Sequence, residues 1–345
     1  MLTGISIEKE EIERIFVGLA SQAQKEIPSN LEPNRKRVIV LAGPTAAGKS
    51  QLAMELAESM HGEIITADSM QVYRGMDVGT AKPSQEDRKK VPHHLIDIRD
   101  ITEIFNVVDF YYEARHACLQ VLSRGNIPIV VGGSGFYLHS LMYGPPSGPP
   151  SVPELRVALE EEFDRLGPEA MYQRLEQLDL EYAHTITRND KQKIVRALEI
   201  IQLTGKKVSK LSWKLRRKPQ NYDFRCWFLN RPREKLYHRI EKRCDKMIEE
   251  GIIEETERLI QAGLQKNPSA SQAIGYRQSL EWLASARTKE DFHTFVSNFK
   301  QASRHYAKRQ LTWFRKEPLF RWLDPDLHDH EVVMDIVKQD YEMGL

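Results

Sequence analysis

Gly43-Pro44-Thr45-Ala46-Ala47-Gly48-Lys49-Ser50 is the stretch that decides the fold of this 345-residue chain. It fits the phosphate-binding pattern G-x-x-x-x-G-K-[ST], which needs a strand before it and a helix after it. Residues 37–42 are apolar and mostly β-branched, as in a buried strand, and residues 51–60 are helix formers with apolar positions on one face. Both flanks agree with the pattern, and we interpret residues 43–50 as a phosphate loop.

The phosphate loop has the chemistry of an anion site. Its glycines allow backbone N–H groups to surround an anion, and the N-terminus of the next helix adds a positive dipole end. Lys49 is placed to reach a terminal phosphate, and the Ser50 hydroxyl is placed to bind Mg²⁺. ATP or GTP is the default occupant of such a loop, but any diphosphate ester fits the same chemistry.

Apolar segments alternate with helical patterns up to residue 142. We expect strands at residues 62–68, 94–98 and 127–131, and helices at residues 109–124 and 136–142. Such alternation is typical of an α/β fold with a parallel sheet, in which ligand loops follow the carboxyl ends of the strands. The phosphate loop, Asp68 and the turn at residues 132–135 should therefore converge on one crevice.

A proline-rich stretch interrupts this pattern. Residues 144–153 contain five prolines, which cannot continue a helix or a central strand. Residues 154–218 are almost entirely helical in pattern, and strands are expected again at 224–229 and 319–323, with long helices between them. We predict an N-terminal extension (1–35), a discontinuous α/β core (36–148 and 224–325), an all-helical insertion (149–223) and a C-terminal tail (326–345).

Charge is unevenly distributed, although the net charge is only +1 at pH 7. Between Arg188 and Arg243 there are 18 Lys or Arg residues against 5 Asp or Glu residues. An excess of this size suggests a polyanionic partner, for which RNA or DNA is the natural candidate, while a solvated surface is the plainer alternative.

Other features exclude several classes of protein. The cysteines at positions 118, 226 and 244 form no C-x-x-C pair, so neither a disulfide framework nor a zinc site is indicated. No apolar run reaches the roughly 18 residues that a membrane helix needs. The acidic N-terminus does not resemble a secretory signal. We therefore expect a cytoplasmic protein without a membrane segment.

Asp68 and Ser134 are the first candidates for chemistry outside the phosphate loop. Asp68 lies 19 residues after Lys49 and ends a predicted strand. It is suited to binding Mg²⁺ or a ribose, or to acting as a general base, and the residues alone leave these roles open. Ser134 offers a hydroxyl in a Gly-Gly-Ser-Gly turn, although the glycines also suit close packing.

Two arginines on one predicted helix are candidates for a phosphate clamp. Arg239 and Arg243 lie one turn apart between residues 232 and 250. Pairing with Glu241 or Glu249 is the alternative role for them. Three aromatic residues are interpreted as packing side chains rather than stacking platforms: Tyr73, Tyr276 and Trp313.

Six segments in a fixed order carry a resemblance to a known family. They are residues 43–50, 68–83, 132–137, 190–199, 273–277 and 307–313. Of these, Asp68-Ser-Met-Gln-Val-Tyr-Arg-Gly-Met-Asp-Val-Gly-Thr-Ala-Lys-Pro83 is highly specific. The series strongly resembles the bacterial tRNA dimethylallyltransferases, also called tRNA isopentenyltransferases, over about residues 36–325. That family moves a dimethylallyl group from its diphosphate to N6 of the adenosine just 3′ of the tRNA anticodon.

The resemblance implies a fold, a cofactor and a set of roles. The fold is a P-loop-kinase-like parallel sheet flanked by helices with an all-helical insertion, and the cofactor is Mg²⁺, with Ser50 as its ligand. The phosphate loop would hold dimethylallyl diphosphate rather than ATP, with Arg243 on the same diphosphate. Asp68 would be the base on adenine N6, and Ser134, which stands where the family usually has Thr, would keep the catalytic role of that hydroxyl, with Arg243 as the third catalytic residue. The residues implied to contact the anticodon stem-loop are Asp68, Ser69, Met70, Gln71, Ser134, Arg156, Gln192, Lys193, Ile194, Val195 and Arg196. A monomer is expected.

Two other functions are considered from the sequence. A small-molecule or nucleoside kinase would hold ATP in the phosphate loop, but the basic insertion and residues 68–83 argue against it. An RNA-binding or RNA-stimulated ATPase would lack transfer chemistry, and the absence of helicase-type motifs after the phosphate loop argues against that.

Overall fold

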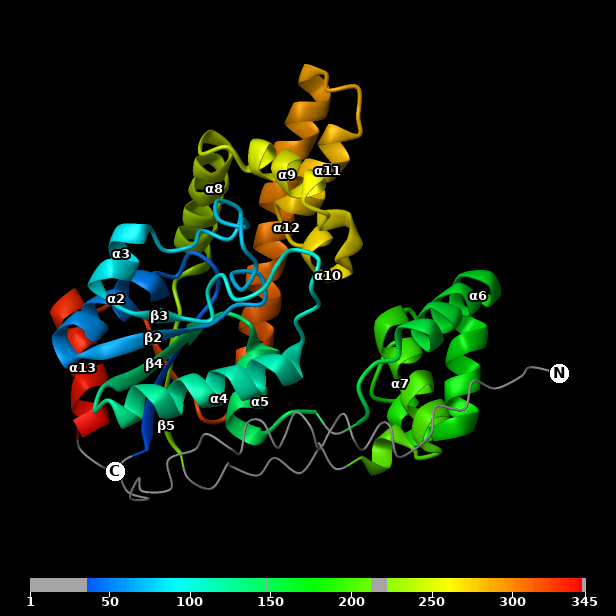
Figure 1. Ribbon diagram of the computed structural model, residues 1–345, viewed down its shortest axis with the longest axis horizontal. Helices are drawn as coiled ribbons and strands as arrows, with labels where there is room; N and C mark the ends of the chain where they lie inside the picture. Colours follow the sequence, from blue (N-terminus) through cyan, green and yellow to red (C-terminus); the bar gives the residue numbers. More distant parts are fainter. Residues whose placement is uncertain (1–35, 147, 212–221, 343–345) are drawn as a thin grey trace. The chain divides into compact units, whose positions relative to one another are not determined.

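The computed structural model describes residues 36–146, 148–211 and 222–342 (Figure 1). The predicted N-terminal extension, residues 1–35, lies outside the described residues, as do residues 343–345. The described chain forms two compact units. The helical unit contains the described residues between 145 and 218, and the core unit contains residues 36–144 and 222–342.

The core unit is built on one parallel sheet. Its strands follow the order β3-β2-β4-β1-β5-β6, and every neighbouring pair is parallel. Strand β1, which leads into the phosphate loop, therefore lies centrally between β4 and β5. The strands are β1 (Arg37–Ala42), β2 (Gly62–Ala67), β3 (His93–His94), β4 (Ile127–Gly132), β5 (Asp223–Leu229) and β6 (Arg321–Leu323). The predicted α/β fold with a parallel sheet is confirmed.

Helices cover both faces of the sheet, because successive strand side chains point to opposite sides. In β1, Val38 and Val40 join one hydrophobic cluster, and Ile39 and Leu41 join another. The first cluster also contains side chains from α4 and α5, and the second contains side chains from α2 and α13. The helices of these layers are α2 (Lys49–Met60), α3 (Gln85–Lys90), α4 (Val107–Ser123), α5 (Gly135–Tyr143) and α13 (His330–Glu342).

The chain after residue 325 is part of this packing. In α13, Val333 and Val337 are buried in the same cluster as α2. Asp340, also buried, accepts hydrogen bonds from Trp227 Nε1 at 3.2 Å and Arg321 Nη1 at 2.6 Å. The description of residues 326–345 as a tail separate from the core is therefore corrected, because this amphipathic helix covers one face of the sheet.

One predicted strand is wrong in extent. Residues 94–98 were expected to be extended, but the strand there contains only His93 and His94. Leu95 and Asp97 have φ angles of +64° and +57°, in the left-handed region, which a β-strand does not accommodate. The chain turns away from the sheet at this point and contacts the loop that follows β2.

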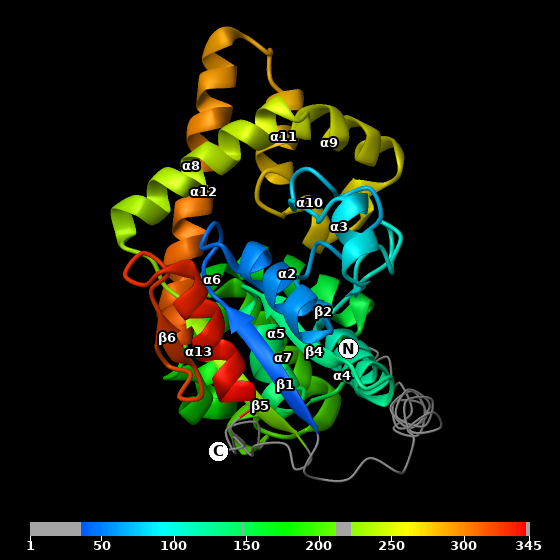
Figure 2. The ribbon, with the colours of Figure 1, turned by 90° about the vertical axis from the view of Figure 1, so that its left-hand side faces the viewer.

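A helical layer follows β5 in the core unit. Figure 2 shows these helices gathered at the end of the sheet where β1 leads into α2. Side chains from four of them, α8, α9, α11 and α12, share a cluster that includes Leu236, Ile240 and Phe299. They are α8 (Arg233–Glu249), α9 (Ile252–Gln261), α10 (Pro268–Ser271), α11 (Tyr276–Leu283) and α12 (Lys289–Phe314), with a 3₁₀ turn at Leu264–Lys266.

The helical unit has a core of its own. It consists of α6 (Pro153–Ala183), α7 (Lys191–Thr204) and a 3₁₀ turn at Val208–Lys210. Helix α6 is interrupted at Gly167 and Asp179, whose backbone angles are not helical. Apolar side chains from both helices form one cluster, so this segment buries a hydrophobic core within itself. Among the described residues of both units, no helix is long and apolar enough to cross a membrane.

Strands β2 and β4 approach each other closely at Gly132, so a substitution of this glycine tests the architecture. A Cβ atom on Gly132 of β4 would lie 2.1 Å from the backbone oxygen of Ala67 on β2. Because backbone atoms of a central strand have little room to shift, Gly132→Ala should reduce the free energy of unfolding by about 3 kcal/mol, near the upper end for overpacking. Urea unfolding of the full chain measures this loss. Ser123→Ala on an exposed position of α4 is the control, and equal stability of the two variants would contradict the close approach.

Candidate active site

A cavity of about 1190 Å³ lies at the carboxyl ends of the strands in the core unit. The phosphate loop, the segment after β2 and the turn after β4 all line it, so their predicted convergence is confirmed. Helices α8 and α12 complete its wall. The predicted site residues that line it are Thr45, Lys49, Ser50, Asp68, Ser69, Met70, Gln71 and Arg243.

The phosphate loop has the backbone conformation that its glycines permit. Gly48 caps α2 with φ +104° and ψ +11°, a left-handed conformation that a side chain would strain. Lys49 begins α2, and its ammonium donates hydrogen bonds of 2.8 Å to the carbonyl oxygens of Gly43 and Pro44. The lysine is thus folded back across the loop, in position to transfer its hydrogen bonds to a bound phosphate.

Arginines hold two further carbonyl groups of the phosphate loop. Arg239 Nε donates to the oxygen of Ala46 at 2.8 Å, and Arg231 Nε donates to the oxygen of Ala47 at 2.8 Å. Arg239, proposed from sequence as a clamp, is therefore a support for the backbone of the loop. It does not pair with Glu241, whose carboxylate accepts a hydrogen bond from Arg304 at 2.6 Å.

Two cations and one carboxylate meet in the cavity. Burial and the neighbouring Arg243 guanidinium lower the pKa of Lys49 to about 7, while Asp68 acts in the opposite direction. Burial also lowers the pKa of Arg243, and Asp68 again opposes the shift. The site therefore has more positive than negative charge and is suited to an anionic ligand.

Asp68 is oriented by the backbone that follows it. Its Oδ1 accepts hydrogen bonds from the N–H groups of Met70 at 2.8 Å and Gln71 at 3.3 Å. Within the described residues, Oδ2 accepts no hydrogen bond. One carboxylate oxygen thus fixes the side chain, and the other is available to a ligand.

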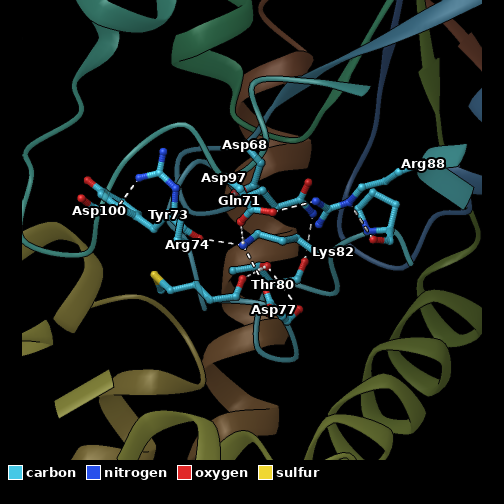
Figure 3. Close-up of polar contacts among 12 residues, drawn as sticks. Asp68, Gln71, Tyr73, Arg74, Asp77, Thr80, Lys82, Arg88, Asp97 and Asp100 are labelled. Atoms are coloured by element: carbon cyan, nitrogen blue, oxygen red, sulfur yellow. Dashed lines mark hydrogen bonds and ion pairs between the residues drawn. The ribbon is translucent and has the colours of Figure 1, made fainter. Parts of the chain in front are cut away.

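Lysine and arginine side chains fix the loop after Asp68 (Figure 3). The ammonium of Lys82, whose side chain is only 2% exposed, donates to Tyr73 O at 2.6 Å, Asp77 Oδ1 at 2.7 Å and Asp97 Oδ1 at 2.6 Å. Arg88 donates to the other oxygen of Asp97 at 2.6 Å. Asp97 therefore links the loop after Asp68 to α3. Its contacts with Lys82 and Arg88 account for its left-handed backbone conformation.

The amide of Gln71 closes the same loop from within. Gln71 Nε2 donates to the carbonyl oxygen of Thr80 at 3.1 Å. Arg243 Nη2 donates to that oxygen at 3.5 Å. The Thr80 carbonyl thus connects α8 with the segment that begins at Asp68.

A buried carboxylate anchors the loop from the helical layer. Glu255 of α9 accepts hydrogen bonds from the N–H groups of Asp77, Val78 and Gly79 at 2.8–3.1 Å, and from the Tyr276 hydroxyl at 2.7 Å. The sequence analysis missed Glu255. It is one of several acidic residues in an amphipathic helix, and nothing in the local sequence distinguishes it.

Helix α12 ties the phosphate loop to the turn after β4. Gln310 accepts a hydrogen bond from Thr45 N at 3.0 Å and donates one to Gly133 O at 2.9 Å. The Tyr306 hydroxyl is hydrogen-bonded to Ser134, and burial raises the pKa of Tyr306 to about 12. Ser134 is not among the cavity-lining residues, but its partner Tyr306 is. No role for Tyr306 or Gln310 was predicted, although residues 307–313 were one of the recognised segments.

The helical unit contains the remaining predicted RNA contacts. Gln192 and Lys193 are exposed on α7. Ile194 and Val195 are fully buried in the core of this unit, so their prediction as RNA-contacting side chains is corrected. They point inward because α7 is amphipathic and they occupy its apolar face.

The two arginines predicted to contact RNA share one buried carboxylate. Arg196 donates to Glu199 Oε2 at 2.6 Å, and Arg156 lies 3.9 Å from the same oxygen. Glu199 also accepts hydrogen bonds from Ser151 and Val152 at the start of the unit. Glu199 therefore holds Arg196, whereas Arg156 donates its hydrogen bond to Glu160 Oε1 at 2.9 Å, and both arginine side chains remain partly exposed.

The sequence profile of the IPP transferase family matches residues 71–317, most of the chain. The chain belongs to the IPP transferase family. It is 66% identical to the tRNA dimethylallyltransferase of Protochlamydia amoebophila over 99% of this chain and 100% of that protein. It is 47% identical to the tRNA dimethylallyltransferase of Chlamydia felis over 89% of this chain and 90% of that protein.

Solved structures agree with this membership. The full-length tRNA isopentenylpyrophosphate transferase of Bacillus halodurans is 36% identical, with a TM-score of 0.65, over 90% of this chain and 98% of that chain. A eukaryotic dimethylallyltransferase, captured acting on tRNA, is 29% identical, with a TM-score of 0.74, over 88% of this chain and 79% of that chain. The P-loop-kinase-like core with a helical insertion is thus shared with solved members of the family.

The lowered pKa of Lys49 predicts a pH dependence of anion binding. Its pKa is about 7 in the free protein, and a bound diphosphate would raise that value by favouring the ammonium. Above pH 7 binding must therefore take up a proton, and affinity should fall by up to about tenfold per pH unit. Below pH 7 Lys49 is already charged and this dependence disappears.

Calorimetric titration with dimethylallyl diphosphate between pH 6 and 9, in buffers of different ionisation enthalpy, measures both the affinity and the proton uptake. Lys49→Arg is the control, because a guanidinium stays charged over this range. Equal slopes for the two proteins above pH 7 would contradict the assignment to Lys49.

Proposed function

We propose that this protein transfers the dimethylallyl group of dimethylallyl diphosphate to N6 of the adenosine 3′-adjacent to the anticodon in tRNA. One observation carries this proposal: Lys49, Arg243 and Asp68 meet in one cavity of a chain that belongs to the IPP transferase family. An anion site beside a carboxylate with one free oxygen provides both halves of an alkyl transfer to an amine.

The donor half of the reaction depends on the phosphate loop. Its N–H groups and the charges of Lys49 and Arg243 would bind the diphosphate and stabilise the negative charge that grows as the C1–O bond breaks. The bonding electron pair leaves with the diphosphate, and the allylic C1 develops positive character. Positive charge fixed in place before the reaction needs no rearrangement when the bond lengthens.

The acceptor half depends on Asp68. The exocyclic amine of adenine is a weak nucleophile, because its lone pair is delocalised into the ring. As the N6–C1 bond forms, N6 loses a proton, and the free Oδ2 of Asp68 is placed to accept it. The hydrogen bonds to Oδ1 hold the carboxylate in one orientation for this transfer.

The residues present fit a Mg²⁺ ion that is shared with the donor. Within the described residues, no cluster of three or more His, Cys, Asp or Glu side chains could hold a metal by itself. Mg²⁺ is commonly bound through one or two side chains together with substrate phosphates and water, and Ser50, which lines the cavity, provides one such side chain. When bound, the ion would neutralise charge on the leaving diphosphate.

The RNA is proposed to bind through its anticodon stem-loop. The target adenine must leave the base stack to reach a cavity, as in other base-modifying enzymes. Ser69, Met70 and Gln71 line that cavity beside Asp68 and are placed to contact the extruded base. Gln192 and Lys193, with Arg156 and Arg196, are proposed to contact the RNA backbone. Since one chain provides all of these groups, we propose that it acts as a monomer.

Replacing Asp68 distinguishes its role as a general base from a role as a metal ligand. Asp68→Asn keeps the size and a hydrogen-bonding oxygen but cannot accept the proton, so kcat should fall by about 10²–10⁴ with near-normal affinity for donor and tRNA. Mass spectrometry of the nucleosides from tRNA measures the product. Asp100→Asn, at an exposed position of the neighbouring loop, is the control. Recovery of the Asp68→Asn variant with added Mg²⁺ would reassign Asp68 to the metal.

The basic stretch after residue 188 predicts a salt dependence. Affinity for tRNA should fall steeply with salt, because phosphate contacts release counterions. Lys193→Glu should weaken tRNA binding and reduce the slope of log K against log salt by about 1, without changing donor affinity. Lys338→Glu on α13 is the matched control, since it makes the same charge change where no RNA contact is proposed. Identical salt series for both variants would show that Lys193 lies on a solvated surface only.

A further inference from the structure

An exposed aromatic pair lies outside the catalytic assignments. Trp313 of α12 is 39% exposed and Phe136 of α5 is 37% exposed, although both belong to the packed core unit. Their rings meet edge to face with centroids 6.2 Å apart. The sequence analysis interpreted Trp313 as a packing residue, and its exposure calls for another explanation.

Trp313 lies one helical turn after Gln310, which lines the cavity, although Trp313 is not itself a lining residue. Tyr306, Gln310 and Trp313 follow one face of α12 at helical spacing. The first two line the cavity and bind the turn after β4, and Trp313 lies over the next residue of that turn. A Cβ atom on Gly135 would lie 2.3 Å from Trp313 Cδ1, so the indole rests directly on the backbone there.

Two aromatic rings pack against the indole. Phe136 meets it on one side, and the His139 ring, also edge to face, has its centroid 6.4 Å away. His139 is fixed in turn by a 2.9 Å hydrogen bond between its Nδ1 and Glu317. These contacts fix the plane of the ring, while more than a third of the side chain remains open to solvent.

Within the part of the chain that the structure describes, helix α12 also carries positive charge without acidic partners, and Arg309 lies one turn before Trp313 on the same face. Lys308, Arg309 and Arg315 are exposed on the same helix, and within the described residues none of them belongs to an ion pair. By contrast, Lys300 and Arg304 of α12 are paired with Asp245 and Glu241. A flat aromatic surface among unpaired cations is the combination that binds unstacked bases and the backbone that carries them.

We propose that Trp313 is a stacking platform for the base that neighbours the target adenosine in the tRNA. This inference rests on the proposed function, because extrusion of one adenosine leaves its neighbours without a stacking partner. Trp313 rests on Gly135, next to Ser134, and would meet such a neighbour outside the cavity. Trp313 is thus a positioning residue that favours the extruded state and does not touch the reacting atoms.

Matched substitutions test whether the π surface matters. Trp313→Phe keeps an aromatic face, and Trp313→Leu keeps an apolar side chain against Gly135 and Phe136 without one. For a synthetic anticodon stem-loop, Trp313→Leu should lower kcat/KM by roughly 5- to 100-fold, Trp313→Phe should lose much less, and donor affinity should not change. Trp322→Leu, at an equally exposed tryptophan of β6, is the control. If the Leu and Phe variants behave alike, the platform does not exist.

A second measurement identifies the stacked base. Stem-loops with an abasic site on the 5′ or the 3′ side of the target adenosine remove the proposed partner one at a time. The penalty of Trp313→Leu should disappear on one of these two RNAs, because both members of the stack are then missing. An equal penalty on all three RNAs would overturn the proposal and indicate a contact with backbone or protein instead. The wild-type protein is measured in the same assay. If it transfers the dimethylallyl group normally, an equal penalty on all three RNAs contradicts only the role of Trp313 and not the proposed function.

Discussion

The carboxylate of Glu255 is the constraint on which the rest of the site depends. It is 2% exposed and accepts four hydrogen bonds, three of them from consecutive backbone N–H groups of the loop that begins at Asp68. Without it, those N–H groups, which lie in a partly buried loop, would lose their hydrogen bonds to a carboxylate. Because Glu255 belongs to α9, it also fixes the distance between the helical layer and the sheet. The cavity between them exists only while that distance is kept.

The electrostatics of the cavity are unfavourable in the free protein and become favourable with a ligand. Lys49 and Arg243 repel one another, and Asp68 balances only one of the two charges. Proteins tolerate such an arrangement where function needs it, since the surrounding contacts hold the groups in place. Here the contacts are specific: Lys49 is held by two carbonyl groups, and Arg243 reaches the Thr80 carbonyl. A diphosphate would replace repulsion with two charge-assisted contacts and would find the donors already in position.

Sequence patterns predicted the parts of the site that are local and missed those that depend on distant segments. The phosphate loop and Asp68 each follow a short buried strand, so strand periodicity and the glycine pattern were sufficient to place them. Glu255 and Gln310 lie 178 and 265 residues from the backbone groups that they bind, and no local pattern indicates which way such side chains point. The strand expected at residues 94–98 was wrong because the apolar pattern of this segment does not reveal that Leu95 and Asp97 adopt left-handed backbone conformations. Ile194 and Val195 were included because a whole segment was transferred by resemblance, whereas helical periodicity alone would have placed them inside.

Helix α12 connects the two halves of the proposed reaction. Along one face, Gln310 holds the phosphate loop and the turn after β4, Tyr306 holds Ser134, and Trp313 rests on Gly135. A rigid helix cannot shift at one of these points without shifting at the others. Any rearrangement of the phosphate loop on binding the donor would therefore be transmitted through Gln310 to Trp313, where the RNA base is proposed to stack. The helix thus provides a physical reason for the proposed donor site and the proposed RNA site to respond to one another.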